Sequence, residues 1–187
     1  MQPLAILLIS KATMKKVYSV LFSLLLISFY TAAQQPHQPN AADILLKLKK
    51  LNFLGTVLYV AAHPDDENTR LIAYMANERL ANTAYLSMTR GDGGQNLIGP
   101  EIREALGVIR TQELLSARSI DGGQQFFTRA NDFGYSKSPE ETQEIWDREK
   151  ALSDVVWIFR KFQPDVIITR FPTDGGGGHG HHPTSAI

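Results

Sequence analysis

The sequence predicts an α/β three-layer fold, Rossmann-like, with a mainly parallel sheet. Three short runs, at residues 56–62, 84–89 and 166–169, are almost wholly apolar and rich in β-formers, as strands buried on both faces are. Segments with apolar residues at helical spacing lie between these runs. The alternation of strand and helix is typical of a parallel sheet covered by helices. At 187 residues, the chain is long enough for one domain with its own core.

The N-terminal segment, residues 1–33, is predicted to be a signal peptide. Lys15 and Lys16 form a positive region, residues 17–30 are apolar, and Thr31-Ala32-Ala33 offers small residues for cleavage before Gln34. Met14 fits as the true start of translation. The alternative is a membrane anchor, but the apolar stretch is shorter than the ~20 residues that a span needs. We therefore expect an exported protein, periplasmic or extracellular, with no membrane span after cleavage.

The composition excludes several classes of protein. Formal net charge is zero over the whole chain, but all the charges before Ala33 are lysines: Lys11, Lys15 and Lys16. The remainder has sixteen basic residues against nineteen acidic ones, so no basic face predicts nucleic-acid binding. The absence of cysteine excludes disulfides, thiol nucleophiles and cysteine-based zinc fingers. Any metal site must therefore use histidine and carboxylate ligands.

The remaining elements follow in order after the signal peptide. Residues 34–55 read as a linker and a short amphipathic helix, and residues 56–187 as the main domain. Ser138, Pro139 and Glu141 form a strong helix start, with serine as the N-cap and proline at the first helical position. Beside the three strands, we expect helices over 43–51, 68–80, 101–120 and 138–162, a short strand over 125–128, a Gly-rich loop over 90–99 and a helix start near Thr184.

The end of the chain bears on the extent of the domain. Ile187 falls one turn into the helix expected near Thr184. We therefore expect the fold to be truncated at its C-terminus, with later strands outside this sequence.

Two short motifs carry the chemistry, and each comes directly after a predicted buried strand. They are His63-Pro64-Asp65-Asp66-Glu67 and His179-Gly180-His181-His182, which together hold four of the five histidines. Ligands of parallel α/β sheets bind at the carboxyl ends of the strands, so the two motifs can converge there. Taken alone, the first motif could be a turn that caps the next helix, and the second a solvated surface loop.

A hydrolytic zinc site needs three nitrogen or oxygen ligands and one open position. His63 and Asp66 can both point into one site, and one histidine of the second motif completes the set. Asp65 is then a spare carboxylate that can take a proton from water, and a second histidine can stabilise a developing oxyanion. Neither a P-loop nor a serine-hydrolase motif is present, because the Gly-rich loop and the serines lack the required context.

These residues resemble the signature of the LmbE-like, or PIG-L, deacetylase family. Its pattern is a strand followed by A-H-P-D-D-E and, later, H-x-x-H; Ala62 to Glu67 match the first part, and His179 to His182 supply the second. The resemblance covers about residues 56–187. It implies Zn²⁺ as the cofactor and an N-acetylated sugar or glycoconjugate as the substrate, as in the enzymes that deacetylate N-acetylglucosaminyl-phosphatidylinositol or the sugar precursors of mycothiol and bacillithiol.

The resemblance also implies residue roles. Zinc would be held by His63, Asp66 and His182, with Asp65 as the general base and His179 polarising the amide carbonyl. Two further positions match possible substrate-binding residues: Arg110 and Asp132. Each position also has a purely structural alternative. Arg110 could form an ion pair with Glu113 on the helix surface, and Asp132 could be an aspartate in a turn.

The chain departs from several relatives within its second motif. His181 stands where those relatives have an acidic residue, so the ligand could be His181 instead of His182. Gly177 stands where some relatives have a tyrosine. The predicted function is an exported zinc-dependent N-deacetylase that releases acetate. The alternatives are another zinc amidase or esterase, and an exported non-catalytic carbohydrate-binding module with a vestigial metal site.

Overall fold

The computed structural model describes residues 11–31, 38–174 and 178–187, and the chain divides into two units, Met1–Ala41 and Ala42–Ile187. The first unit contains helix α1 (Lys11–Thr31), which includes the apolar stretch of the predicted signal peptide. Two residues of the predicted cleavage site, Ala32 and Ala33, lie outside the described residues, as does Gln34. Within the described ranges, no helix has both the length and the apolar character needed to cross a membrane.

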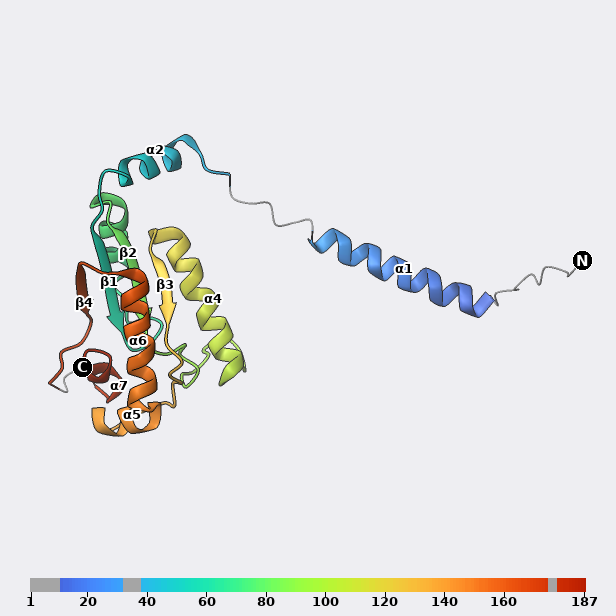
Figure 1. The fold of residues 1–187 in the computed structure, drawn as a ribbon. Coiled ribbons are helices and arrows are strands. Elements are labelled where there is room, and N and C mark those ends of the chain that lie inside the picture. The colour runs from blue at the N-terminus through green and yellow to red at the C-terminus, as the bar shows by residue number, and fades with distance from the viewer. Residues whose placement is uncertain (1–10, 32–37, 175–177) are drawn as a thin grey trace, which may run out of the picture. The chain divides into compact units, whose positions relative to one another are not determined.

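The second unit is built on a four-stranded sheet in which every neighbouring pair is parallel (Figure 1). The strand order is β3-β2-β1-β4, so the first strand of the chain lies in the interior of the sheet. The strands are β1 (Thr56–Ala61), β2 (Asn82–Ser87), β3 (Gln124–Phe127) and β4 (Val166–Thr169). This arrangement confirms the predicted α/β class with a parallel sheet.

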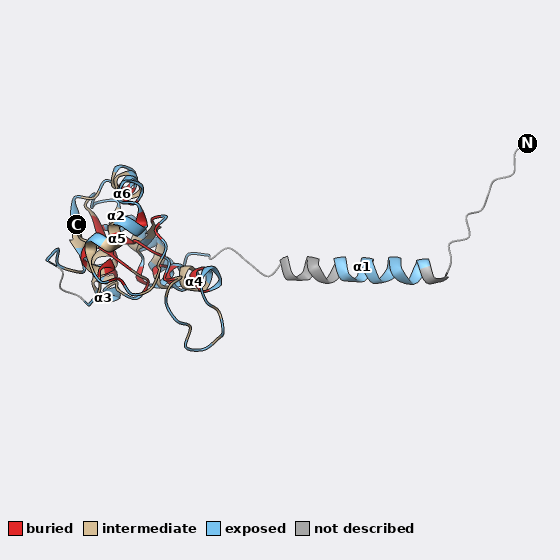
Figure 2. Ribbon diagram, turned by 90° about the horizontal axis from the view of Figure 1, so that it is seen from below, coloured by how far each residue is buried: buried red, intermediate tan, exposed pale blue. Residues whose placement is uncertain are grey.

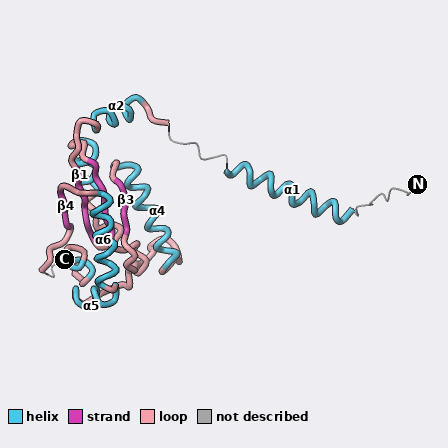
Figure 3. Tube along the Cα trace, in the orientation of Figure 1, coloured by secondary structure: helices cyan, strands magenta, loops and turns pink. Residues whose placement is uncertain are grey.

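Helices and loops connect the strands, as the crossovers of a parallel sheet require (Figure 3). The helix predicted over residues 68–80 is α-helical only in its first half and continues as a π-helical segment, η1. The helices are α2 (Ala41–Lys50), α3 (Thr69–Ala73), η1 (Tyr74–Glu78), α4 (Glu104–Asp121), α5 (Pro139–Trp146), α6 (Arg148–Phe162) and α7 (His181–Thr184).

The core consists of apolar side chains on both faces of the sheet, which gives the fold its three layers. On one face, Leu58 of β1 and Leu86 of β2 pack against Ile158 of α6. On the other, Tyr59 of β1 packs with Ile72 of α3 and with residues of α4. Adjacent residues of a strand point to opposite faces, so an uninterrupted apolar run feeds both cores. Buried residues accordingly concentrate in β1 and β2 (Figure 2). The expectation of burial on both faces is wrong for β4, where Val166 and Ile167 are exposed because the strand lies at the edge of the sheet.

The long helix predicted over residues 138–162 is wrong in one respect, because it is broken into α5 and α6. Ser138 caps α5 as expected, and its side chain accepts a hydrogen bond from the Glu141 N–H. At Asp147 the backbone enters the left-handed region (φ 57°), and the same residue then caps α6. Ile145 of α5 and Leu152 of α6, on either side of the break, are both exposed.

Several boundaries also differ from the sequence expectation, among them that of β2, which was expected over 84–89 and spans Asn82–Ser87. Helix α4, expected over 101–120, begins at Glu104 and leaves Ile102 exposed in the preceding loop. The last helix, α7, begins at His181 and ends at Thr184, where a helix was expected to begin. Both ends of the second motif are therefore held by short-range helical hydrogen bonds, including the one from the Ser185 N–H to the His181 carbonyl.

Both motifs lie at the carboxyl ends of the strands. His63 follows β1 after one residue, and the register pairs β1 directly with β4, the strand that leads to the second motif. Figure 1 shows α5 and α7 at the end of the sheet toward which the strands point. The sheet therefore brings together two segments that are more than 100 residues apart in the sequence, as the topology of such folds predicts.

Candidate active site

The first motif forms a tight turn that directs its side chains into one place. The Asp66 carboxylate accepts a 2.8 Å hydrogen bond from the His63 backbone N–H, and the same carboxylate oxygen lies 3.1 Å from the His63 ring Nδ1. The Tyr85 hydroxyl of β2 donates a hydrogen bond to the His63 carbonyl. The turn is thus fixed to the next strand, and His63 and Asp66 are held side by side.

Asp65, between these two residues, has a backbone conformation that is rare for a residue with a side chain. Its φ is 95°, and its N–H donates a 2.9 Å hydrogen bond to the Glu67 carboxylate. Arg118 of α4 holds the other Glu67 oxygen at 3.3 Å, and both of these side chains are buried. Positive φ at such residues is maintained only where surrounding structure imposes it. The pair of Glu67 and Arg118 supplies that constraint.

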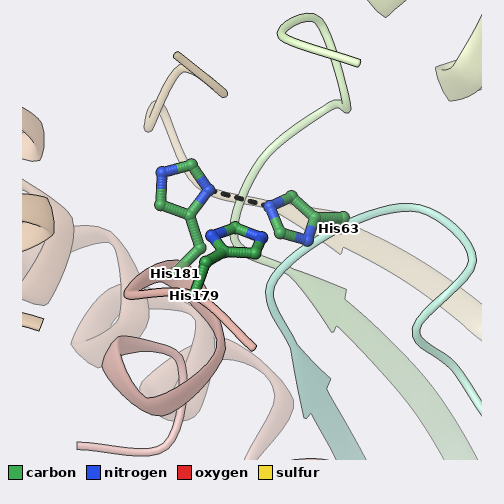
Figure 4. Close-up of side chains that lie close together, drawn as sticks. All are labelled: His63, His179 and His181. Atoms are coloured by element: carbon green, nitrogen blue, oxygen red, sulfur yellow. Dashed lines mark hydrogen bonds between the residues drawn. The ribbon is translucent and has the colours of Figure 1, made fainter. Parts of the chain in front are cut away.

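The second motif approaches from α7 and its preceding loop (Figure 4). Its glycine is required, since a Cβ at Gly180 would lie only 2.1 Å from the Ser138 carbonyl oxygen. The Gly180 N–H also donates a 2.9 Å hydrogen bond to the Ser136 carbonyl. This close packing of the loop against the start of α5 directs His179 and His181 toward His63.

Two sets of three side chains in the described residues are close enough to hold a metal ion. In the first set, ligand atoms of His63, Asp66 and His182 all lie within 4.8 Å of one another. These are the three residues predicted as zinc ligands, and two imidazoles with one carboxylate form a common ligand set of catalytic zinc. The structure brings the three together; their role as ligands stays a prediction.

The second set consists of His63, His179 and His181, again with ligand atoms within 4.8 Å. In this set, His63 Nε2 and His181 Nδ1 are 2.8 Å apart, the length of a hydrogen bond. Two ligands of one tetrahedral zinc, each at about 2.0–2.1 Å from the metal, would be about 3.3 Å apart. In the first set the shortest such separation, between His63 Nδ1 and Asp66 Oδ2, is 3.1 Å and so closer to this value. The first set is therefore the better fit, and the predicted choice of His182 over His181 agrees with it.

Within the described residues, two ring nitrogens of the second motif are buried and have no hydrogen-bond partner. They are Nδ1 of His179 and Nε2 of His181. Buried polar atoms in folded proteins nearly always have a partner, so an unpaired nitrogen in a cleft indicates a site that binds a ligand or an ion. Neither nitrogen belongs to the set of His63, Asp66 and His182, so the fit of that set to a metal rests on its own donor atoms, and the unpaired nitrogens indicate polar binding positions beside it.

Burial changes the proton affinity of these groups. The pKa of His179 is lowered to about 4 by desolvation and then by the like charges of His182 and His63. Desolvation and the same kind of repulsion lower the pKa of His181 to about 3. Burial alone raises the pKa of Asp66, but the hydrogen bonds from His63 outweigh it, so the pKa lies below its ordinary value. At neutral pH His179 and His181 are thus neutral imidazoles, beside an ionised Asp66 carboxylate.

A pocket of about 900 Å³ opens in front of this cluster. The predicted general base, both predicted substrate-binding residues and two of the histidines line it: His63, Asp65, Arg110, Asp132 and His179. The Gly-rich loop after β2, from Gly91 to Glu101, forms another part of its wall. Every residue predicted to contact the substrate therefore faces one cavity, although their individual roles remain predictions.

Within this pocket, Arg110 is bonded to Asp65. Its guanidinium lies 2.7 Å from the Asp65 carboxylate, donates to the Pro64 carbonyl and also forms the predicted pair with Glu113 at 2.8 Å. Desolvation against the pocket wall raises the pKa of Asp65, and the positive charge of Arg110 opposes the rise. Arg110 is thus more than a helix-surface residue, because it sets the position and the charge of the predicted base.

Asp132 lies beside the histidines and lines the same pocket. Its carboxylate oxygens are 3.9 Å from His63 Nε2 and 3.8 Å from His181 Nδ1. Burial raises the pKa of Asp132, partly offset by the hydrogen bond from the Gly134 N–H. The position is compatible with the predicted contact to sugar hydroxyls and also places a carboxylate close to a predicted metal ligand.

Sequence reasoning missed several residues that support the site. Arg118 and Glu67 constrain the first motif, and the Phe171 ring stacks on His182 with ring centroids 3.9 Å apart and planes 6° apart. The sequence held a signal for Arg118, which lies four residues after Leu114 and therefore on the buried face of α4. An unpaired charge is costly there, so a buried acidic partner could have been predicted. Phe171 also had a signal, since it is the second residue after β4 and so lies at the edge of the sheet where ligands bind.

Comparison with known proteins places this geometry in a family. Residues 58–186 match the family model described as PIG-L, GlcNAc-PI de-N-acetylase. The chain is 31% identical over 165 residues to a 1D-myo-inositol 2-acetamido-2-deoxy-alpha-D-glucopyranoside deacetylase of Kineococcus radiotolerans, covering 73% of this chain and 44% of that protein. It is 29% identical over 140 residues to a mycothiol S-conjugate amidase of Streptomyces coelicolor, covering 67% and 47%. The chain spans less than half of either relative.

Two solved structures share the fold. An N,N'-diacetylchitobiose deacetylase from Pyrococcus horikoshii superposes with a TM-score of 0.52 at 18% identity, covering 81% of this chain and 59% of the other. GalB, the 4-carboxy-2-hydroxymuconate hydratase of Pseudomonas putida, gives 0.50 at 17% identity, with 72% and 53% covered. These likenesses concern the fold alone. The family match spans both histidine motifs and the sheet that joins them, and on that basis this chain belongs to the PIG-L, or LmbE-like, family.

Proposed function

We propose that this chain forms the active site of a zinc-dependent de-N-acetylase, which hydrolyses the acetamide of an N-acetylated sugar or glycoconjugate. One observation carries the proposal: the convergence of His63, Asp66 and His182 behind a pocket that Asp65 and His179 line. The relatives that are named as deacetylases act on an acetamido sugar, which supports the substrate class.

The chain's own residues divide the work between binding the metal and moving protons. His63, Asp66 and His182 would hold zinc, which supplies Lewis-acid polarisation and makes water a nucleophile near neutral pH. Asp65 accepts the proton of the attacking water, and its raised pKa makes it a stronger base. Its exposed side chain can then return that proton to the departing nitrogen.

His179 is suited to stabilise the oxyanion. At neutral pH it is a neutral imidazole, because its pKa is lowered to about 4, and a neutral ring still offers one N–H donor. A donor that is fixed before the reaction stabilises negative charge as it develops on the carbonyl oxygen. Water adds to the acetamide carbon, the C–N bond breaks, and the products are acetate and a free amine.

The first test needs no knowledge of the substrate. We would measure zinc per folded chain for residues 34–187, wild type and His182→Ala. One zinc per wild-type chain, lost in the variant, is the expected result. A folded wild-type protein without zinc would rule out the metal site. Acetate release from N-acetylglucosamine conjugates would then be assayed, since the fold is shared with a hydratase and does not itself fix the reaction.

Asp65→Asn separates an enzyme from a non-catalytic binding module. The amide cannot accept a proton from water but tolerates the left-handed backbone at position 65. An enzyme loses turnover and keeps its zinc. A sugar-binding module with a vestigial metal site would instead show no acetate release in either protein, with sugar binding unchanged. If the protein releases an amine together with an acid other than acetate, the broader amidase reaction is favoured, as in the relative named as an amidase.

We further propose that the protein is exported. Lys15 and Lys16 followed by an apolar stretch support this location, as they are typical of a signal peptide. Expression of the whole chain in a bacterial host, with mass spectrometry of the mature N-terminus, tests it. A mature chain that begins at Gln34 is expected, and retention of residues 14–33 would contradict it.

A further inference from the structure

We propose that His181 is a positioning residue for His63: it accepts a hydrogen bond at the far side of the ring and so holds His63 in the tautomer that can bind a metal. This inference rests on the proposed metal site and goes beyond it, because it assigns a role to the residue by which this chain departs from several relatives. It concerns the outer shell of the site, which commonly decides how well a metal ligand is oriented.

The two ring nitrogens of His63 face two different groups. Nδ1 faces the Asp66 carboxylate at 3.1 Å, on the side of the proposed metal ligands. Nε2 faces Nδ1 of His181 at 2.8 Å. A neutral imidazole has one N–H and one lone pair. If Nε2 carries the proton and donates it to His181, then Nδ1 has the lone pair and is free to bind the metal.

His181 is held rigidly enough to define this direction. Its side chain is fully buried (0% exposed), with the Phe133 ring edge-on at a centroid distance of 4.4 Å and the Trp146 ring at 4.8 Å. Trp146 is itself fixed by a 2.8 Å hydrogen bond from its indole N–H to the Asn131 carbonyl. A ring packed between two aromatic side chains cannot easily swing away, so its acceptor nitrogen stays aimed at His63.

The other group near His63 Nε2 does not replace this contact. The Asp132 carboxylate is 3.9 Å from that nitrogen, which is beyond hydrogen-bonding distance. His181 is thus the near partner and Asp132 lies behind it, 3.8 Å from the same His181 nitrogen. In zinc proteins the second nitrogen of a ligating histidine usually donates to a carboxylate, a carbonyl or water. Here an imidazole takes that place.

The test is a comparison of zinc affinity in three proteins: wild type, His181→Phe and His181→Asn. Phenylalanine fills the same aromatic site and removes the acceptor, whereas the asparagine side-chain oxygen can take the place of Nδ1. Loss of an outer-shell partner costs roughly 10–100-fold in metal affinity. We expect a loss of that size for H181F and recovery of most of it in H181N, measured by competition with a chromophoric chelator. Circular dichroism establishes that each variant is folded.

A cobalt-substituted sample adds a readout that packing alone does not move. The visible absorption of bound Co²⁺ reports ligand number and geometry, so it should keep its tetrahedral intensity in H181N and change in H181F. Wild-type affinity in H181F would overturn the inference, since packing would then suffice. Should H181F not fold, His181→Leu replaces it with the same expectation.

Other outcomes separate this inference from the proposals on which it rests. If H181N and H181F both lose stoichiometric zinc while His182→Ala retains it, His181 is itself a ligand and the positioning role is wrong. If folded wild-type protein binds no zinc, the proposed function fails first. Tight wild-type binding together with unchanged H181F overturns only the role of His181.

Discussion

Arg118 and Glu67, 51 residues apart in the sequence, form an ion pair of 3.3 Å in which both side chains are more than nine-tenths buried. Arg118 also chelates the Asp121 carboxylate, with its closest contact at 2.6 Å, and its guanidinium lies over the Tyr85 ring. Tyr85 in turn donates to the His63 carbonyl. A single buried arginine therefore connects helix α4 to both ends of the first motif.

The first prediction concerns this buried pair. Glu67→Gln keeps the shape of the side chain but removes the charge that faces Arg118. Breaking a buried charged hydrogen bond costs about 1–3 kcal/mol, and the variant should lose unfolding free energy of that order. Turnover should fall as well, because the Asp65 N–H loses its carboxylate acceptor. Denaturant unfolding and acetate release are the two measurements.

The matched control for Glu67→Gln is Glu149→Gln. Glu149 pairs with Arg148 at 3.1 Å, but both side chains are largely exposed (80% and 60%). Exposed pairs contribute little to stability, so this variant should be indistinguishable from wild type in both measurements. Equal effects of the two substitutions would show that burial of the Glu67 pair has no special role.

The second prediction concerns Arg110 and the pH dependence of turnover. Its positive charge lowers the pKa of Asp65 and opposes desolvation, which raises it. In Arg110→Ala that opposition is gone, so the pKa of the base should rise. Because the base must be deprotonated, activity should be lost at a higher pH on acidification than in wild type. The acid limb of the plot of kcat against pH measures this shift. A shift of the limb to higher pH supports Asp65 as the base, and a shift to lower pH contradicts it.

Arg129→Ala is the control for Arg110→Ala. Arg129 also pairs with an aspartate, Asp154, at 2.7 Å, but away from the active-site pocket. Removing it should leave the acid limb in place. An unchanged limb in Arg110→Ala as well would mean that Asp65 is not the group whose ionisation limits the rate.

The third prediction concerns the stability of the metal-free protein. The pKa values of His179 and His181 lie at about 4 and about 3 in the folded chain, against 6.5 for an ordinary histidine. Between these values the unfolded chain binds protons that the folded chain does not, so acidification favours unfolding. The melting temperature in the presence of EDTA should fall as the pH is lowered from 7 to 5. His181→Phe removes one of the two groups and should show a shallower fall.

The fourth prediction concerns the stacking of Phe171 on His182. Aromatic pairs contribute about 0.5–1.5 kcal/mol, which corresponds to roughly two- to tenfold in an equilibrium constant. Phe171→Leu should weaken zinc binding by that factor, since the ring would no longer restrict His182. Tyr135→Leu is the comparison: Tyr135 is 73% exposed and lies near His179, at 5.8 Å between ring centroids, so zinc affinity should not change. A weaker affinity only in the Tyr135 variant would contradict the assignment of His182 as a ligand.

The sequence was sufficient for the strands and for the two motifs, for a common physical reason. Strands β1, β2 and β4 are short apolar runs, and such runs are visible without knowledge of their neighbours. The motifs follow strands directly, so the topology of a parallel sheet predicts that they meet. These are properties that local pattern and chain order encode.

Features that depend on tertiary contacts were not accessible in this way. The break at Asp147 occurs without glycine or proline, and an aspartate within an amphipathic pattern, although it can cap a helix, does not by itself predict a break. Glu67 and Arg118 are 51 residues apart, and the sequence around either residue does not predict the other as its partner. The partner of His63 Nε2 likewise depends on how α7 packs against α5 and not on the spacing within the second motif.

The pairing of β1 with β4 has a consequence for how the protein folds. It joins residues such as Thr56 and Asp165, which are 109 positions apart, and the metal cluster spans a similar interval. Contacts of such long range close late, because the entropy of a large loop must be lost before they form. Zinc capture during refolding should therefore lag behind the appearance of helical structure, and the ion would act as a kinetic reporter for the last pairing event of the sheet.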